Sequence, residues 1–83
     1  MDLQETLDQA WSRQATGHQR EAEEALAEAA EAATEPADCQ RIAQTAEQCA
    51  ERAHRLHRRR FKKIAERARD RAEVLEGIGT GAD

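Results

Sequence analysis

The chain has 83 residues, with 13 Lys and Arg against 17 Asp and Glu, and only 2% of its residues are aromatic. A chain of this length holds one domain with a small apolar core, so regular helix packing or a second subunit is expected to contribute to its stability. No apolar run approaches the roughly 20 residues of a membrane-spanning helix, and the N-terminus is too acidic and polar for a signal peptide. We therefore expect a cytoplasmic protein that makes no contact with a membrane.

Charge is divided unevenly along the chain. Residues 1–50 carry three Lys or Arg against eleven Asp or Glu, a net charge of −8, whereas residues 51–83 carry ten against six, a net charge of +4. Any interaction of the protein must therefore use an acidic half and a basic half.

The first predicted element is a helix over about residues 2–33. Asp2 is a suitable N-cap, and Glu5, three residues on, completes a capping-box pattern. Apolar residues then recur every three or four positions on both sides of Gly17, as expected for one face of a continuous helix. We therefore predict that Gly17 lies inside the helix, where a glycine costs about 1 kcal/mol relative to alanine.

The second predicted element is a helix over about residues 36–76. Thr34 is expected to cap it, and Pro36 falls in a first turn that tolerates proline. An eleven-residue apolar repeat, which includes Cys39, Ala50, Phe61 and Ala72, indicates a nearly straight stripe along this helix. Residues 77–83 contain three glycines and are expected to form a flexible tail. The predicted fold is all-α, with residues 1–76 forming one long helical hairpin.

A lone hairpin would leave part of its apolar stripes in water, so we predict a homodimer in the form of an antiparallel four-helix bundle. Acidic residues of the first helix are expected to pair with basic residues of the other chain and to set the orientation. The charged residues of this predicted interface are Glu24, Glu28, Glu31, Arg60, Arg67 and Arg71, and its apolar residues are Trp11, Leu26, Phe61, Ile64, Val74, Leu75 and Ile78.

Few residues could carry catalysis. Ser12 is the only serine, and the chain has neither a glycine-rich phosphate loop nor an evident pair of inward carboxylates. We therefore predict that the protein is not an enzyme and uses no cofactor.

Three histidines and a cysteine make a metal site an alternative. The predicted hairpin would bring His18 opposite His54, with His57 and Cys49 about one turn away, and imidazole and thiolate are zinc ligands. His54 and His57 are three residues apart, whereas metal-binding helices more often use a spacing of four. The simpler interpretation is that these histidines fill polar gaps and that the two cysteines fill the core.

Between Arg52 and Lys63 the chain has seven cations and no acid. Five of them centre opposite the apolar stripe on a helical wheel, and they form the predicted basic face: Arg52, Arg55, Arg59, Lys62 and Lys63. Such a face suits an acidic protein or the phosphates of RNA or DNA, although it has no exposed aromatic residue for base stacking. We favour a protein-interaction or scaffolding module, with a nucleic-acid-binding regulator as the alternative and a metal-binding bundle third.

Two resemblances add to these expectations. Residues 17–36 read Gly-x-x-x-Glu-Ala-x-x-Ala-Leu-x-x-Ala before a proline, which resembles the middle of one tetratricopeptide repeat; the pattern does not recur after Pro36. The layout of the whole chain resembles that of plasmid regulators that dimerise as helical hairpins and bind RNA. The first resemblance implies a repeat unit that needs a neighbour to cover it, and the second implies a dimeric bundle. The sequence by itself assigns no family.

Overall fold

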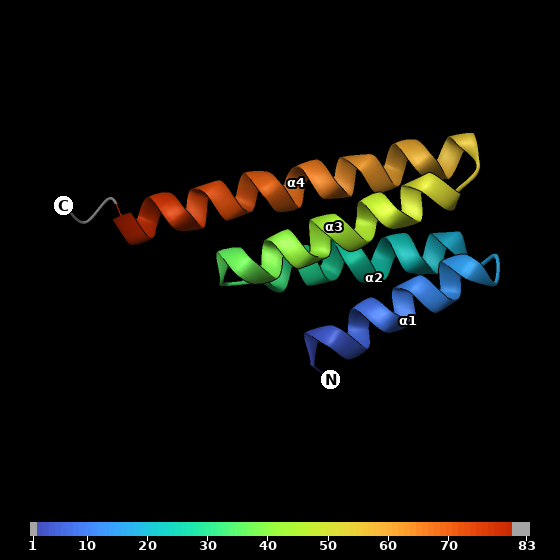
Figure 1. Cartoon of the computed structure of the whole chain (residues 1–83), viewed down its shortest axis with the longest axis horizontal. Coiled ribbons are helices and arrows are strands. Elements are labelled where there is room, and N and C mark those ends of the chain that lie inside the picture. Colours follow the sequence, from blue (N-terminus) through green and yellow to red (C-terminus); the bar gives the residue numbers. More distant parts are fainter. Residues whose placement is uncertain (1, 81–83) are drawn as a thin grey trace.

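The computed structural model describes residues 2–80, and the side chains of residues 2–77. Over that range the chain forms four helices: α1 (Leu3–Ala15), α2 (Gln19–Ala32), α3 (Pro36–Arg52) and α4 (Arg55–Thr80). Successive helices run antiparallel, and the C-terminal end of α4 extends beyond the other three (Figure 1). The all-α prediction is confirmed, but each of the two long helices of the predicted hairpin is broken once.

The first break lies at Gly17. This residue has φ +91°, a backbone conformation that residues with a Cβ rarely adopt. The amide of His18 donates to the carbonyl oxygen of Arg13 at 2.7 Å, which closes the end of α1. The prediction of one helix over residues 2–33 is therefore wrong. A spacing of three or four residues continues across the turn because α1 and α2 bury their apolar faces against the same core.

A helix–turn–helix at this position fits the tetratricopeptide-like segment better than a continuous helix does. Such repeats consist of two antiparallel helices joined by a short turn, and α1 and α2 are arranged in this way around Gly17. The pair α3 and α4 then stacks against them, so the segment is covered by a neighbouring helix pair of the same chain (Figure 1).

The second break lies between α3 and α4. Ala53 has extended backbone angles (φ −85°, ψ 156°) and ends α3. The guanidinium of Arg58 donates from Nε to the carbonyl oxygen of Ala50 at 3.2 Å and from Nη2 to that of Ala53 at 3.4 Å. The Ala50 oxygen also accepts from the amide of Ala53 at 3.3 Å, so Arg58 adds to the cap at the end of α3. The prediction of one helix over residues 36–76 is wrong, and the residues at the break, Ala53 and His54, include neither glycine nor proline.

The helix ends agree with the sequence patterns in part. Asp2 caps α1, and its Oδ1 accepts a hydrogen bond from the amide of Glu5 at 2.8 Å. Pro36 lies in the first turn of α3, as expected, but Glu35 rather than Thr34 occupies the N-cap position. α4 continues to Thr80, beyond the end predicted at residue 76, and residues 81–83 lie outside the described part of the chain.

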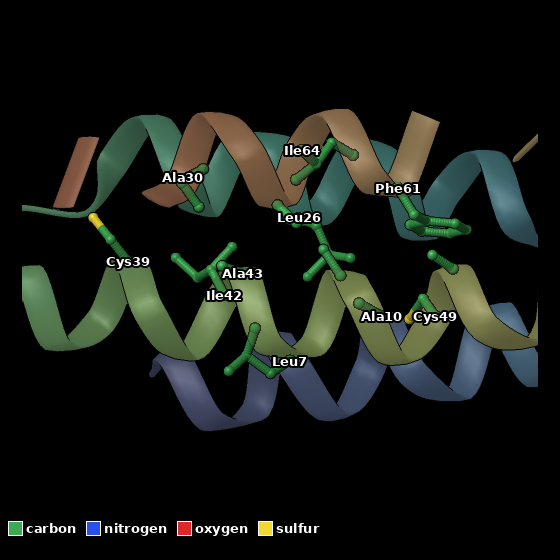
Figure 2. Close-up of a cluster of buried hydrophobic side chains, with 14 of the residues drawn as sticks. Leu7, Ala10, Leu26, Ala30, Cys39, Ile42, Ala43, Cys49, Phe61 and Ile64 are labelled. Carbon is green, nitrogen blue, oxygen red and sulfur yellow. The ribbon is translucent and has the colours of Figure 1, made fainter. Parts of the chain in front are cut away.

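The core lies among the four helices, and the largest interface between two helices is that of α3 with α4. Leu26, Ile42 and Phe61 come from three different helices and are fully buried, together with Cys39 and Cys49 (Figure 2). Most of the remaining core consists of alanine, which lets helix backbones approach closely. Across residues 2–80, no helix combines the length and apolar character needed to cross a bilayer.

Candidate binding surface

The five residues of the predicted basic face are all exposed. The break after α3 places Arg52 at the end of that helix and the other four on the first turns of α4. The predicted basic face therefore spans the end of α3 and the first turns of α4. It does not lie on one continuous helix.

Two of the five cations interact with other parts of the chain. The guanidinium carbon of Arg52 lies 4.8 Å from the ring centroid of Trp11, a cation–π distance. Lys62 lines a groove that also contains Glu47. The pKa of Glu47 is lowered, first by its hydrogen bond from Arg69 and to a smaller extent by the charge of Lys62.

The other three cations, Arg55, Arg59 and Lys63, form no hydrogen bond or ion pair within the described part of the chain. Leu56 lies among them and is 81% exposed. We name these four residues the basic corner: Arg55, Leu56, Arg59 and Lys63. Leu56 was missed in the sequence interpretation, although it lies five residues before Phe61, or about 140° away on a helical wheel, and so falls outside the apolar stripe.

The predicted dimer interface is largely used within one chain. Leu26 and Phe61 are 0% exposed, so these two side chains belong to the core of one chain, whereas Ile64 is 9% exposed and lines a groove between α2 and α4. Trp11 and Leu75 are half-buried against the same core. The premise that a lone chain leaves its apolar stripes uncovered is therefore wrong, because four helices of one chain cover them. Val74 is exposed, and the side chain of Ile78 lies outside the described residues.

Some charged residues of that predicted interface lie near one another within the chain. Glu31 lines a groove between α2 and α4 together with Arg67 and Arg71. The Nε atom of Arg71 donates to the carbonyl oxygen of Ala33 at 2.8 Å. Glu31, Arg67 and Arg71 thus line one groove of a single molecule, and the pairing of these charges across a dimer stays a prediction. Glu28 lies elsewhere, in a groove between α1 and α2.

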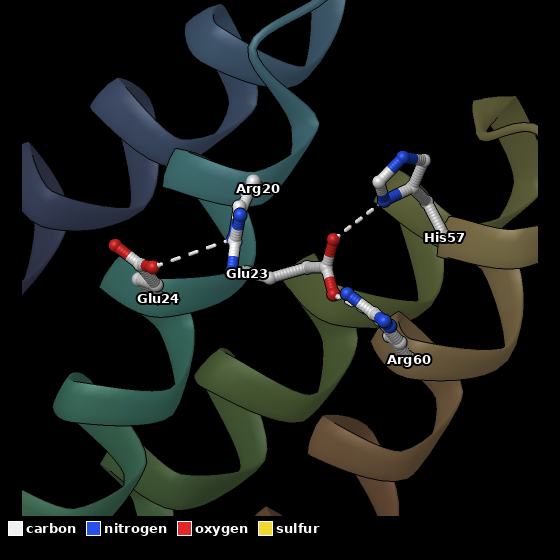
Figure 3. A network of polar contacts seen from close by, with 5 residues as sticks. All are labelled: Arg20, Glu23, Glu24, His57 and Arg60. Atoms are coloured by element: carbon white, nitrogen blue, oxygen red, sulfur yellow. Dashed lines mark hydrogen bonds and ion pairs between the residues drawn. The ribbon is translucent and has the colours of Figure 1, made fainter.

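One polar network of the α2–α4 contact was not predicted from the sequence. The side chain of Glu23 points from α2 toward α4 and lies between His57 and Arg60 (Figure 3). Its neighbour Glu24 points away and pairs with Arg20, one turn earlier, at 3.9 Å. Glu23 belongs to the same run of glutamates as the exposed ones. Only the tertiary fold distinguishes it from them as a buried residue of the α2–α4 contact.

The four residues of the alternative metal site are not brought together as ligands. His18 occupies the N-cap position of α2 and is exposed, His54 is exposed, and His57 contacts Glu23. Within the described residues, no group of three or more His, Cys, Asp or Glu is placed to hold a metal ion. Burial raises the pKa of the Cys49 thiol to about 11, so this residue is a protonated core side chain at neutral pH.

Fold and surface together define a small all-α protein of two stacked helix pairs with an exposed basic corner. Comparison of the chain with protein-family models, with curated proteins and with solved structures gave no match. The likeness of residues 17–36 to a tetratricopeptide repeat is therefore a local one and assigns no function to the chain.

Proposed function

We propose that the protein is a non-enzymatic interaction module that binds an acidic partner protein through the basic corner. A single observation carries this proposal. Three cations without a counterion in the described chain lie to one side of a leucine that is 81% exposed. Protein interfaces combine an apolar anchor with a charged rim in this way, and complementary charge sets the orientation and speeds association.

A nucleic-acid-binding regulator is the second candidate, because the same cations would neutralise phosphates. Leu56 argues against it, since a leucine neither stacks on bases nor contacts phosphate oxygens favourably. The surface beside the corner is also of mixed charge, because Lys62 shares its groove with Glu47, Glu51 and Glu66 as well as with Arg58 and Arg69.

The homodimer predicted from the sequence is a separate proposal. Its remaining support is apolar: Val74 is exposed and Leu75 is half-buried near the end of α4. Sedimentation equilibrium at micromolar concentration should give twice the chain mass if a dimer forms, and the melting temperature should rise with concentration. The mass of a single chain would contradict the dimer and leave the interaction module untouched.

The interaction module is tested by capture followed by reconstitution. Wild-type protein and an R55E/L56Q/R59E variant serve as baits in nuclease-treated extract of cells that express the protein. Each captured acidic protein is then purified and titrated against both baits by calorimetry. At least one should bind the wild type and bind the variant roughly tenfold or more weakly.

The matched control is an R13E/R20E variant, which makes the same change in net charge at exposed arginines of α1 and α2. It should bind the purified partner as the wild type does. Equal binding by all three proteins would refute the proposal. So would tight, steeply salt-dependent binding of a short DNA duplex or RNA hairpin that the corner variant loses.

A further inference from the structure

Two large apolar side chains among the described residues are exposed, and both lie on α4. Leu56 is 81% exposed and Val74 is 61% exposed. They are 18 positions apart, which corresponds to about five full turns of an α-helix and about 27 Å. The two side chains therefore project from the same side of α4, one near its beginning and one near its end.

Cations occupy the positions between these two residues on the same side of the helix. Lys63 and Arg67 follow Leu56 by seven and eleven positions, which places each within about 20° of the line from Leu56 to Val74. Both are exposed, and neither forms a hydrogen bond or ion pair within the described chain. We name Leu56, Lys63, Arg67 and Val74 the α4 stripe. It has apolar ends and a positively charged middle.

A shallow groove between α2 and α4 runs beside the α4 stripe. Its floor contains Ala27, Ala30 and Ile64, and Lys63 and Arg67 form its α4 edge. Small side chains at the floor allow another helix to approach closely. The opposite edge of the groove belongs to α2 and is acidic, with Glu24 and Glu31. A helix in the groove would therefore turn an acidic side toward α4 and a neutral or basic side toward α2.

The charges on this face and the length of the α4 stripe limit which molecule can bind along α4. Helix α2 of a second copy does not supply this acidic helix, because α2 buries Ala22, Leu26 and Ala30 in its own core. At 14 residues, or about 21 Å, α2 is also shorter than the stripe. An anionic membrane or a nucleic acid would meet further carboxylates on the outer side of α4, at Glu66, Asp70 and Glu73, all of which are exposed.

We infer that the partner protein presents an amphipathic helix of at least five turns, which lies along α4 and places apolar residues on Leu56 and Val74 and acidic residues on Lys63 and Arg67. This rests on the proposed function and extends the binding surface from the basic corner along α4 to Val74. Helix-in-groove recognition uses anchors of this kind at helical spacing. The spacing of seven, four and seven positions along the stripe is the same in both directions, so it does not dictate the direction of the bound helix.

The test uses a synthetic helical peptide of about 22 residues, or six turns. It has leucines and glutamates at the spacing of the α4 stripe, and lysines on the side that would face α2. A control peptide of the same composition has one leucine moved to the opposite side of the helix. Fluorescence anisotropy should show micromolar binding of the first peptide and roughly tenfold weaker binding of the control. Amide chemical shifts should change along α4 and α2.

Variants of the protein separate the contributions. L56Q/V74Q should weaken binding of the first peptide roughly tenfold or more, whereas E66Q/E73Q, on the other exposed side of α4, should not weaken it. K63E/R67E should no longer bind the peptide with glutamates and should instead bind a peptide with lysines in their place. All of these positions are exposed, so circular dichroism should show unchanged helix content and melting.

Several results would overturn the inference. Equal binding of both peptides, or shifts confined to other helices, would show that α4 does not recognise the spacing. A dimer that L56Q/V74Q converts to a monomer would make a second copy the occupant. Binding of phosphatidylserine vesicles that depends on Leu56 and Val74 would make a membrane the occupant. Binding of a DNA duplex that depends on these two residues would make a nucleic acid the occupant. If a captured partner loses binding to the corner variant while the peptide fails, the proposed function stands and only this inference fails.

Discussion

The Nδ1 atom of His57 lies 2.6 Å from Oε2 of Glu23, which joins α4 to α2. The Glu23 side chain is only 10% exposed, and the Nε atom of Arg60 lies 3.9 Å from its other oxygen. A carboxylate removed from water costs free energy unless it is hydrogen-bonded or paired, so these two partners are what allow Glu23 to face the core.

Replacing Glu23 with alanine should lower the free energy of unfolding by about 1–3 kcal/mol, because the substitution leaves the part-buried imidazole of His57 without its partner. The neighbouring Glu24→Ala change removes only an exposed pair and should change stability by about 0.5 kcal/mol or less. Urea unfolding followed by circular dichroism measures both. Equal effects of the two substitutions would show that the Glu23–His57 contact contributes nothing to stability.

Gly17→Ala should destabilise the protein by about 1–2 kcal/mol, because a Cβ is disfavoured at the positive φ of this turn. Gly77 is the matched control, since it lies within α4 and an added Cβ would meet nothing within 4 Å. Gly77→Ala should leave stability unchanged or raise it by up to about 1 kcal/mol. A stabilising effect of Gly17→Ala would instead indicate that α1 and α2 are one helix.

Stability should fall at alkaline pH because of Cys49. Burial raises the pKa of its thiol from 9.0 to about 11 in the folded chain. Between those values only the unfolded chain releases the proton, which favours unfolding. The contribution of the protonated Cys49 thiol to folding stability is therefore fully present below about pH 9. It is lost as the pH rises through about 11, an effect on the order of 2 kcal/mol.

The measurement is urea unfolding at several pH values for the wild type and for Cys49→Ala. The variant should be less stable at neutral pH because it has a small cavity, but its stability should depend less steeply on pH above about 9. Some alkaline dependence should remain, because burial also raises the pKa of Cys39. Identical pH dependence in the two proteins would contradict the assignment to Cys49.

Arg58→Gln should lower the free energy of unfolding by about 1 kcal/mol, because it removes the side-chain bonds to the last carbonyls of α3. Arg59 is the matched control, as it is adjacent, exposed and without a hydrogen bond or ion pair in the described chain. Arg59→Gln should leave stability nearly unchanged. If both changes had the same effect, the break between α3 and α4 would not depend on Arg58.

The basic face was predictable from the sequence only in part. Its five cations were expected at the surface and all five are exposed, because a charged side chain opposite an apolar stripe stays in contact with water. Which of them remain without a counterion was not predictable. Glu47 approaches Lys62 and Arg69 only because α3 folds back on α4. Leu56 was overlooked, although its departure from the apolar spacing was visible.

The helical class, the Asp2 cap and the position of Pro36 depend on neighbouring residues, so the sequence by itself determined them. The breaks at Gly17 and Ala53 were decided by the tertiary structure. A spacing of three or four apolar residues is satisfied equally by one long helix and by two helices that share a core. The same is true of charge, because the fold alone determines that Glu23 faces α4 whereas Glu24, one residue later, faces water.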